Sequence, residues 1–99
     1  MKGTTIIFDD KRLPCVFIDS HEGQDIFRNL LADPIPQAPR RILSNAYDVL
    51  TEVISNAISN DVDKNTIYLL LSDLRAIKIA LCVIIKGHRV IAIEVDKEI

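Results

Sequence analysis

The longest apolar-periodic segment, residues 63–86, constrains the fold of this chain more than any other feature. Its sequence is DKNTIYLLLSDLRAIKIALCVIIK, and in heptads counted from Ile67 every first and fourth position is aliphatic. These positions are Ile67, Leu70, Leu74, Ile77, Leu81 and Ile84. A second apolar stripe consists of Leu69, Ala76, Ile79 and Val83. A helix with two apolar stripes has to be covered on both sides, so we expect residues 63–86 to form the buried centre of the fold.

A strand is the main alternative for the end of this segment. Residues 77–85 are rich in Ile and Val and could pair with residues 88–95 across Lys86 and Gly87. The sequence favours the helix because Lys-Gly is not one of the strong two-residue hairpin turns and the heptad pattern continues unbroken to Ile84. Both interpretations give an α+β domain.

A second long helix is predicted over residues 40–59. Pro39 suits the first position of a helix, where its missing N–H costs no hydrogen bond. The apolar face that follows is wide, and a polar stripe runs along the opposite side. The connector to the next helix, residues 60–63, is only NDVD, so the two helices should form an antiparallel hairpin.

Short strands are expected at both ends of the chain. Residues 4–8 and 14–18 are rich in β-branched and aromatic side chains and predict a β-hairpin, and residues 88–95 alternate with a period of two. Between them, Asp19 or Ser20, or alternatively Asp25, caps a short helix whose first turn Gly23 weakens. The prediction is a single α+β domain spanning residues 1–99, in which a small antiparallel sheet packs on the helical hairpin in the order ββαααβ.

Composition limits the function classes. Twelve basic and fourteen acidic residues give a net charge of -2, which argues against a general nucleic-acid binder. A DNA-binding surface would require Arg40, Arg41, Lys86 and Arg89 to lie on one exposed face. No secretory signal opens the chain, and the longest nearly apolar run, residues 76–85, is too short to span a membrane. We therefore expect a soluble, cytoplasmic protein without membrane contact.

The two cysteines do not form a recognisable site. Cys15 and Cys82 lack the CxxC spacing of redox or zinc sites, and the chain lacks the cysteine density of secreted scaffolds. We expect both thiols to be reduced and buried.

The densest polar cluster offers one chemical alternative. It consists of Asp9, Asp10, Asp19, His21 and Glu22. A small metal-dependent hydrolase could use the last three of these residues. The spacing matches no ligand motif, however, and the two ends of a hairpin strand lie roughly 15 Å apart at about 3.3 Å per residue. Turn formation and helix capping explain the cluster better, so we predict no catalytic residue, metal ligand or cofactor.

The excess of apolar helix surface instead favours association with a protein. Two cations near the positive end of a helix are locally unfavourable, which makes Arg40 and Arg41 candidates for contacting an acidic partner. Tyr47 and Ile54 on the wide face of residues 40–59 complete the predicted partner-binding set. The resulting hypothesis is a non-enzymatic interaction module, a small adaptor, regulatory subunit or inhibitor, that forms a homodimer or docks on a larger protein. We expect residues 40–59 to carry that contact.

Overall fold

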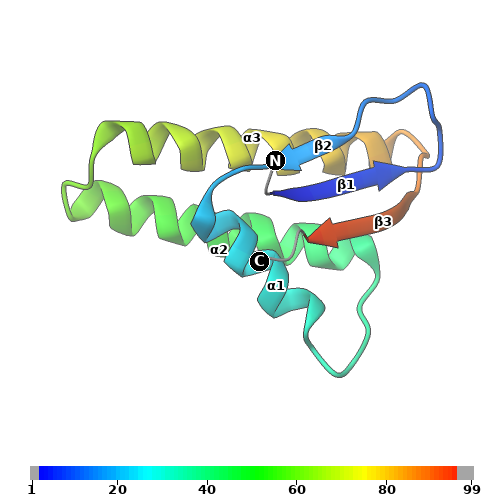
Figure 1. Ribbon diagram of the computed structural model, residues 1–99, viewed down its shortest axis with the longest axis horizontal. Helices are drawn as coiled ribbons and strands as arrows, with labels where there is room; N and C mark the ends of the chain where they lie inside the picture. Colours follow the sequence, from blue (N-terminus) through cyan, green and yellow to red (C-terminus); the bar gives the residue numbers. More distant parts are fainter. Residues whose placement is uncertain (1–2, 96–99) are drawn as a thin grey trace.

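The structure is a computed structural model that describes residues 3–95, and it combines a small sheet with three helices (Figure 1). The elements are β1 (Thr4–Phe8), β2 (Val16–Ile18), α1 (His21–Leu31), α2 (Pro39–Ser59), α3 (Lys64–Ile85) and β3 (Val90–Val95). The helices pack on the sheet, with α2 and α3 side by side and antiparallel. The predicted α+β class and the order ββαααβ are confirmed.

The sheet is antiparallel with the strand order β2-β1-β3. Thr4 pairs with Ile18 on one side and with Val95 on the other, so β1 is the central strand. Side chains alternate across the sheet: Ile6 and Ile18 are fully buried against the helices, whereas Phe17 is half exposed on the opposite face. Residues 77–85 form the last turns of α3 and not a strand, which settles the alternative left open by the sequence.

Each of the two long helices is followed by a residue in the left-handed conformation, which ends the helix. After α2, Asp61 has a φ of 52°, and the N–H of Val62 donates to the carbonyl of Ala57. After α3, Gly87 has a φ of 105°, and the N–H of His88 donates to the carbonyl of Val83. These are Schellman-type ends, which satisfy carbonyls that the helix itself leaves unpaired. As predicted, Pro39 is the first residue of α2 and residues 60–63 connect the two helices.

A buried carboxylate on α3 fixes the start of α1. The two side-chain oxygens of Asp73 accept hydrogen bonds from the backbone N–H groups of Asp19 and Ser20, each at 2.9 Å. Ser20 in turn caps α1 by accepting from the N–H of Gly23 at 2.9 Å. A Cβ at Gly23 would lie 2.7 Å from Oδ2 of Asp73 and 2.7 Å from Cγ2 of Ile18. Gly23 is therefore required by this close approach, which sequence reasoning read only as a weak first turn.

The core lies between the sheet and one face of the helices, and α2 contributes more to it than α3. The buried residues of α2 are Ile42, Leu43, Ala46, Leu50, Ile54 and Ala57, whereas those of α3 are Leu70, Asp73, Ile77 and Ala80. The heptad positions of α3 are buried or partly buried, but Leu69 and Ile79 of the second stripe remain 42% and 47% exposed. The expectation that both stripes are covered is wrong, because β2, α1 and α2 leave one side of α3 open within residues 3–95.

Two expectations drawn from composition have different outcomes. Cys15 and Cys82 are free thiols, but both are exposed, so the prediction that they are buried is wrong. Cys82 lies on the open side of α3 and Cys15 immediately precedes β2. No helix within residues 3–95 has both the length and the apolar character that crossing a membrane requires.

Candidate functional site

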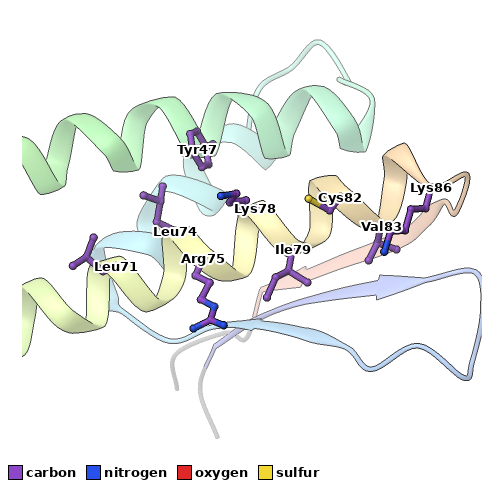
Figure 2. Close-up of a pocket in the computed structure, with 9 residues that line it drawn as sticks. All are labelled: Tyr47, Leu71, Leu74, Arg75, Lys78, Ile79, Cys82, Val83 and Lys86. Atoms are coloured by element: carbon purple, nitrogen blue, oxygen red, sulfur yellow. The ribbon is translucent and has the colours of Figure 1, made fainter.

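A groove runs along the open side of α3 and is the candidate site within residues 3–95. It encloses a cavity of about 620 Å³ and is lined mainly by α3, with one aromatic side chain contributed by α2 (Figure 2). The lining residues are Tyr47, Leu71, Leu74, Arg75, Lys78, Ile79, Cys82, Val83 and Lys86. We call this surface the α3 groove.

The local sequence explains why these side chains face outward. Leu70, Ile77 and Ala80 occupy the face of α3 that packs into the core. With about 100° between successive residues, Leu71 and Cys82 are placed on the opposite side of the helix. Figure 2 shows the labelled side chains following α3 from Leu71 to Lys86, with Tyr47 of α2 lying opposite Lys78. The groove therefore follows directly from which face of α3 the core uses.

Apolar side chains form the floor of the α3 groove without being buried there. Leu71 is 42% exposed and Ile79 is 47% exposed, and one turn before the groove Tyr68 is 65% exposed. Single exposed apolar residues are ordinary on protein surfaces, whereas Leu71 and Ile79 lie in one groove with the partly buried Leu74 and Val83, and apolar side chains gathered in a groove favour an interaction site.

The charges around this floor have one sign only. Arg75, Lys78 and Lys86 line the groove, and no aspartate or glutamate does. None of the three cations forms an ion pair with another residue in the range 3–95. The only carboxylate of α3, Asp73, is 1% exposed and accepts hydrogen bonds from the N–H groups of Asp19 and Ser20, just before α1. The α3 groove is therefore apolar with an uncompensated cationic rim.

The four residues predicted to bind a partner lie in three different environments. Arg40 and Arg41 are exposed in the first turn of α2. Tyr47 is partly buried and lines the α3 groove. Ile54 is 6% exposed and belongs to the core, so it is not accessible to a partner in this structure. The structure thus brings only Tyr47 of this set to the groove.

The basic residues do not gather on a single surface. Arg40, His88 and Arg89 line a separate cavity of about 230 Å³ beside the start of α2, whereas Lys86 lines the α3 groove. Arg12 lies on the hairpin loop and is paired with Asp10. The arrangement that a DNA-binding surface would require is therefore only partly present.

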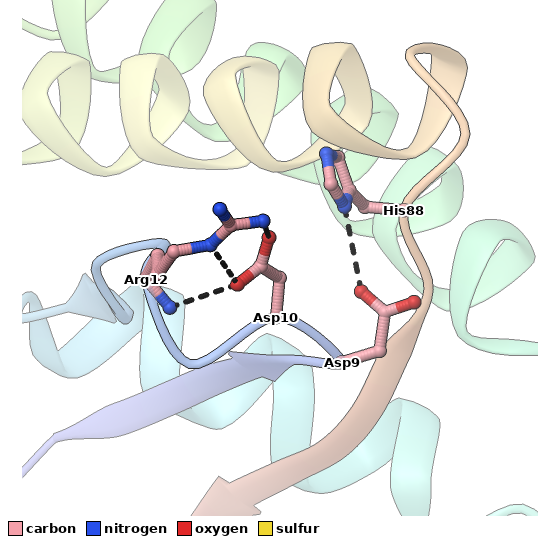
Figure 3. Close-up of polar contacts among 4 residues, drawn as sticks. All are labelled: Asp9, Asp10, Arg12 and His88. Atoms are coloured by element: carbon pink, nitrogen blue, oxygen red, sulfur yellow. Dashed lines mark hydrogen bonds and ion pairs between the residues drawn. The ribbon is translucent and has the colours of Figure 1, made fainter.

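The predicted polar cluster is divided between two places. Just after β1, Oδ2 of Asp10 accepts a hydrogen bond from the Arg12 guanidinium at 3.0 Å, and its Oδ1 accepts one from the Arg12 backbone N–H at 2.9 Å. In the same loop, Oδ1 of Asp9 lies 3.5 Å from Nδ1 of His88 (Figure 3). These hydrogen bonds from Arg12 lower the pKa of the Asp10 carboxyl, because they stabilise its charged form. On α1, His21 pairs with Asp25 at 3.3 Å.

This division leaves the hydrolase alternative without a supporting geometry. Asp19 uses its backbone N–H to bind Asp73, and the nearest carboxylate partner of His21 is Asp25, not Asp19 or Glu22. Across residues 3–95, no three His, Cys, Asp or Glu side chains are grouped so that they could hold a metal ion.

Sequence reasoning missed most of the α3 groove. The sequence pattern does not predict Leu71, Arg75, Lys78 or Cys82 as contact residues, although it places Ile79 and Val83 in the second apolar stripe. One signal was present in the sequence: Asp73, the only acidic residue between Lys64 and Lys86, falls between the seam positions Leu70 and Ile77. A carboxylate on the inward face leaves the outward face with cations alone.

Comparisons with known proteins do not extend these observations, since the chain matches no protein-family model, no curated protein and no solved structure.

Proposed function

We propose that this protein is a non-enzymatic interaction module, a small adaptor, regulatory subunit or inhibitor, that docks on a protein through the α3 groove. The observation that carries the proposal is the open side of α3, where Leu71 and Ile79 are more than two-fifths exposed beside three cations that have no ion-pair partner within residues 3–95. The core is closed by other residues, so folding alone gives these apolar side chains no role.

The energetic argument is the cost of leaving apolar surface in water. Burying apolar area contributes about 25 cal/mol per Å², so covering two or three half-exposed leucine-sized side chains supplies a few kcal/mol toward binding. The α3 groove also resembles typical peptide-binding clefts in shape, being elongated and mostly apolar with a small number of charged groups at its edge. We expect the protein to act in the cytoplasm, where free thiols such as Cys15 and Cys82 remain reduced.

The two cysteines provide a test inside the cells that produce the protein. Cys82 lines the α3 groove, and Cys15 is exposed elsewhere, before β2. Alkylation by a small maleimide, read by mass spectrometry of each cysteine peptide, reports whether the groove is covered. We expect Cys82 to react more slowly than Cys15 in cells, relative to the ratio measured for the purified protein.

A groove variant is the matched control for this measurement. Ile79→Glu places a charge on the groove floor and should restore the reactivity of Cys82 in cells, because it weakens docking. Ser55→Glu, on the exposed side of α2, should leave the protection of Cys82 unchanged. Equal reactivity ratios in cells and in purified protein would refute docking through the groove.

A further inference from the structure

The occupant of the α3 groove can be specified further from its shape and charge, an inference that rests on the proposed function. We infer that the groove binds an acidic amphipathic helix of a different protein, with apolar side chains on the Leu71 and Ile79 floor and carboxylates opposite Arg75, Lys78 and Lys86. Three features of the described residues support this choice of partner.

The first feature is charge. Each cation of the rim lacks a carboxylate partner within residues 3–95, and the groove lining contains no acidic side chain. Complementary charges across an interface accelerate association and reject partners of the wrong sign. A partner with carboxylates along its edges is therefore favoured over a neutral or basic one.

The second feature is that the backbone of α3 offers no free hydrogen-bonding groups to a partner. The groove runs along a helix from Leu71 to Lys86, a length of about 22 Å at about 1.5 Å per residue. The peptide groups of α3 are already engaged within the helix, so an extended peptide laid along it would find no strand edge for its own N–H and C=O groups. A helix satisfies its own backbone and can place apolar residues from successive turns into the groove.

The third feature argues against a second copy of this chain. Pairing two α3 grooves symmetrically would bring two sets of Arg75, Lys78 and Lys86 together without a carboxylate between them. The outer face of α2 has the carboxylates Asp48 and Glu52 that could pair with the rim of a second copy, but its other residues are mostly polar and could not fill the apolar floor. Its exposed apolar residues, Val49 and Ile58, are nine positions apart and so lie on opposite flanks of that helix.

Synthetic helices provide the test. The probe is a peptide of about 15 residues, or four helical turns, with leucines on one face and glutamates on both flanks. Two control peptides replace every glutamate by glutamine or by lysine, and a third keeps the glutamates but replaces the leucines by serine. Affinity is measured by fluorescence anisotropy with the full chain, and the site is mapped by protection of Cys82 against alkylation with Cys15 as the internal reference.

We expect the acidic peptide to protect Cys82 and to bind about tenfold or more tightly than the glutamine peptide, since several rim pairs act together. Added salt should reduce this difference because surface charges are screened. Replacing Arg75, Lys78 and Lys86 together by glutamine should abolish the preference while the glutamine peptide still binds. The matched variant, Arg40→Gln with Arg41→Gln and Lys64→Gln, removes three cations outside the groove and should retain the preference.

The alternative outcomes separate this inference from the proposed function. If the acidic and glutamine peptides bind equally and both protect Cys82, the groove docks proteins but the acidic partner is wrong. If no peptide protects Cys82, docking through the groove fails as well. Two further results would contradict the acidic helix as the partner. Protection of Cys82 that increases with the concentration of the protein alone would identify a second copy as the partner. Protection of Cys82 by a DNA or RNA duplex, but not by the acidic peptide, would identify nucleic acid.

Discussion

The two long helices, α2 and α3, are nearly equal in length and lie antiparallel, yet they bury different amounts of their surface. Helix α2 has 21 residues and buries six of them, whereas α3 has 22 residues and buries four. The chain of α3 is the more apolar of the two, with Tyr68, Leu71 and Ile79 among its exposed residues. Apolar content therefore does not decide which of the two helices has more buried residues.

The difference also separates the roles of the two helices. The outer face of α2 carries serines together with Asp48 and Glu52, which is what a solvated helix face requires. The outer face of α3 combines aliphatic side chains with Arg75 and Lys78. Solvation alone does not account for the second composition, which is why we place the docking surface on α3.

The largest expected effect compares one isoleucine from each helix. Ile54→Ser on α2 should lower the free energy of unfolding by about 3–5 kcal/mol, because it leaves a cavity and buries a hydroxyl. Ile79→Ser on α3 should lower it by only about 1 kcal/mol, since the side chain is 47% exposed and only its buried half is lost. Urea denaturation of both variants measures the difference. Similar losses for the two would mean that the side of α3 bearing Ile79 is covered in the free protein.

A slightly smaller effect is expected at the buried face of α3. Asp73→Ala removes both acceptors used by the N–H groups of Asp19 and Ser20 and should cost about 2–4 kcal/mol of unfolding free energy. Asp73→Asn keeps one carbonyl acceptor and should cost less. Both variants can be measured by urea denaturation, with loss of hydrogen-exchange protection expected first in α1. An alanine variant as stable as the original chain would show that the carboxylate does not hold the start of α1.

A third prediction concerns the space between α1 and α3. Gly23→Ala should destabilise the fold by about 1–3 kcal/mol, because the added methyl group has to displace Asp73 and Ile18. Gly87→Ala provides a matched control with a different cause: no atom lies within 4 Å of an added Cβ, and only the φ of 105° opposes the substitution. The double variant Gly23→Ala with Asp73→Ala separates the clash with Asp73 from the clash with Ile18. Because the first clash is absent in the double variant, its loss of unfolding free energy should be smaller than the sum of the two single losses.

The smallest expected effect on stability concerns the ion pair between Asp10 and Arg12 in the hairpin loop, outside both helices. The pKa of Asp10 is lowered in the folded state by Arg12, so this pair stabilises the fold above the ordinary aspartate pKa, and the contribution is lost as the pH falls through the lowered value. Arg12→Gln should therefore slightly reduce stability at neutral pH and have no effect in strong acid. Denaturant midpoints across the acid range measure this change. A difference between the two proteins that persists in strong acid would point to a role for Arg12 beyond this pair.

Much of the fold could be predicted from the sequence because helix ends and hydrophobic periods depend on residues that are close together in the chain. Pro39 marks the start of α2, Gly87 marks the end of α3, and the change from a helical period to a period of two marks β3. The antiparallel arrangement of α2 and α3 followed from a connector too short for any other path.

The docking surface was less accessible because periodicity shows which residues share a face but not what covers that face. Two apolar stripes on residues 63–86 predicted a helix covered on both sides, whereas β2, α1 and α2 leave Leu69 and Ile79 of the second stripe exposed. The sequence predicted the contact on α2, with Ile54 among its residues, whereas in the folded chain Ile54 belongs to the core.

The sequence by itself determined the elements of this protein, their order and the absence of a coherent metal-ligand motif, since these depend on spacing along the chain. The tertiary structure alone decided that Asp73 holds the two residues before α1, that Gly23 has no room for a side chain and that α3 has an open side. Each of these depends on contacts between residues far apart in sequence, and a three-stranded sheet can cover only one face of the helix that lies against it.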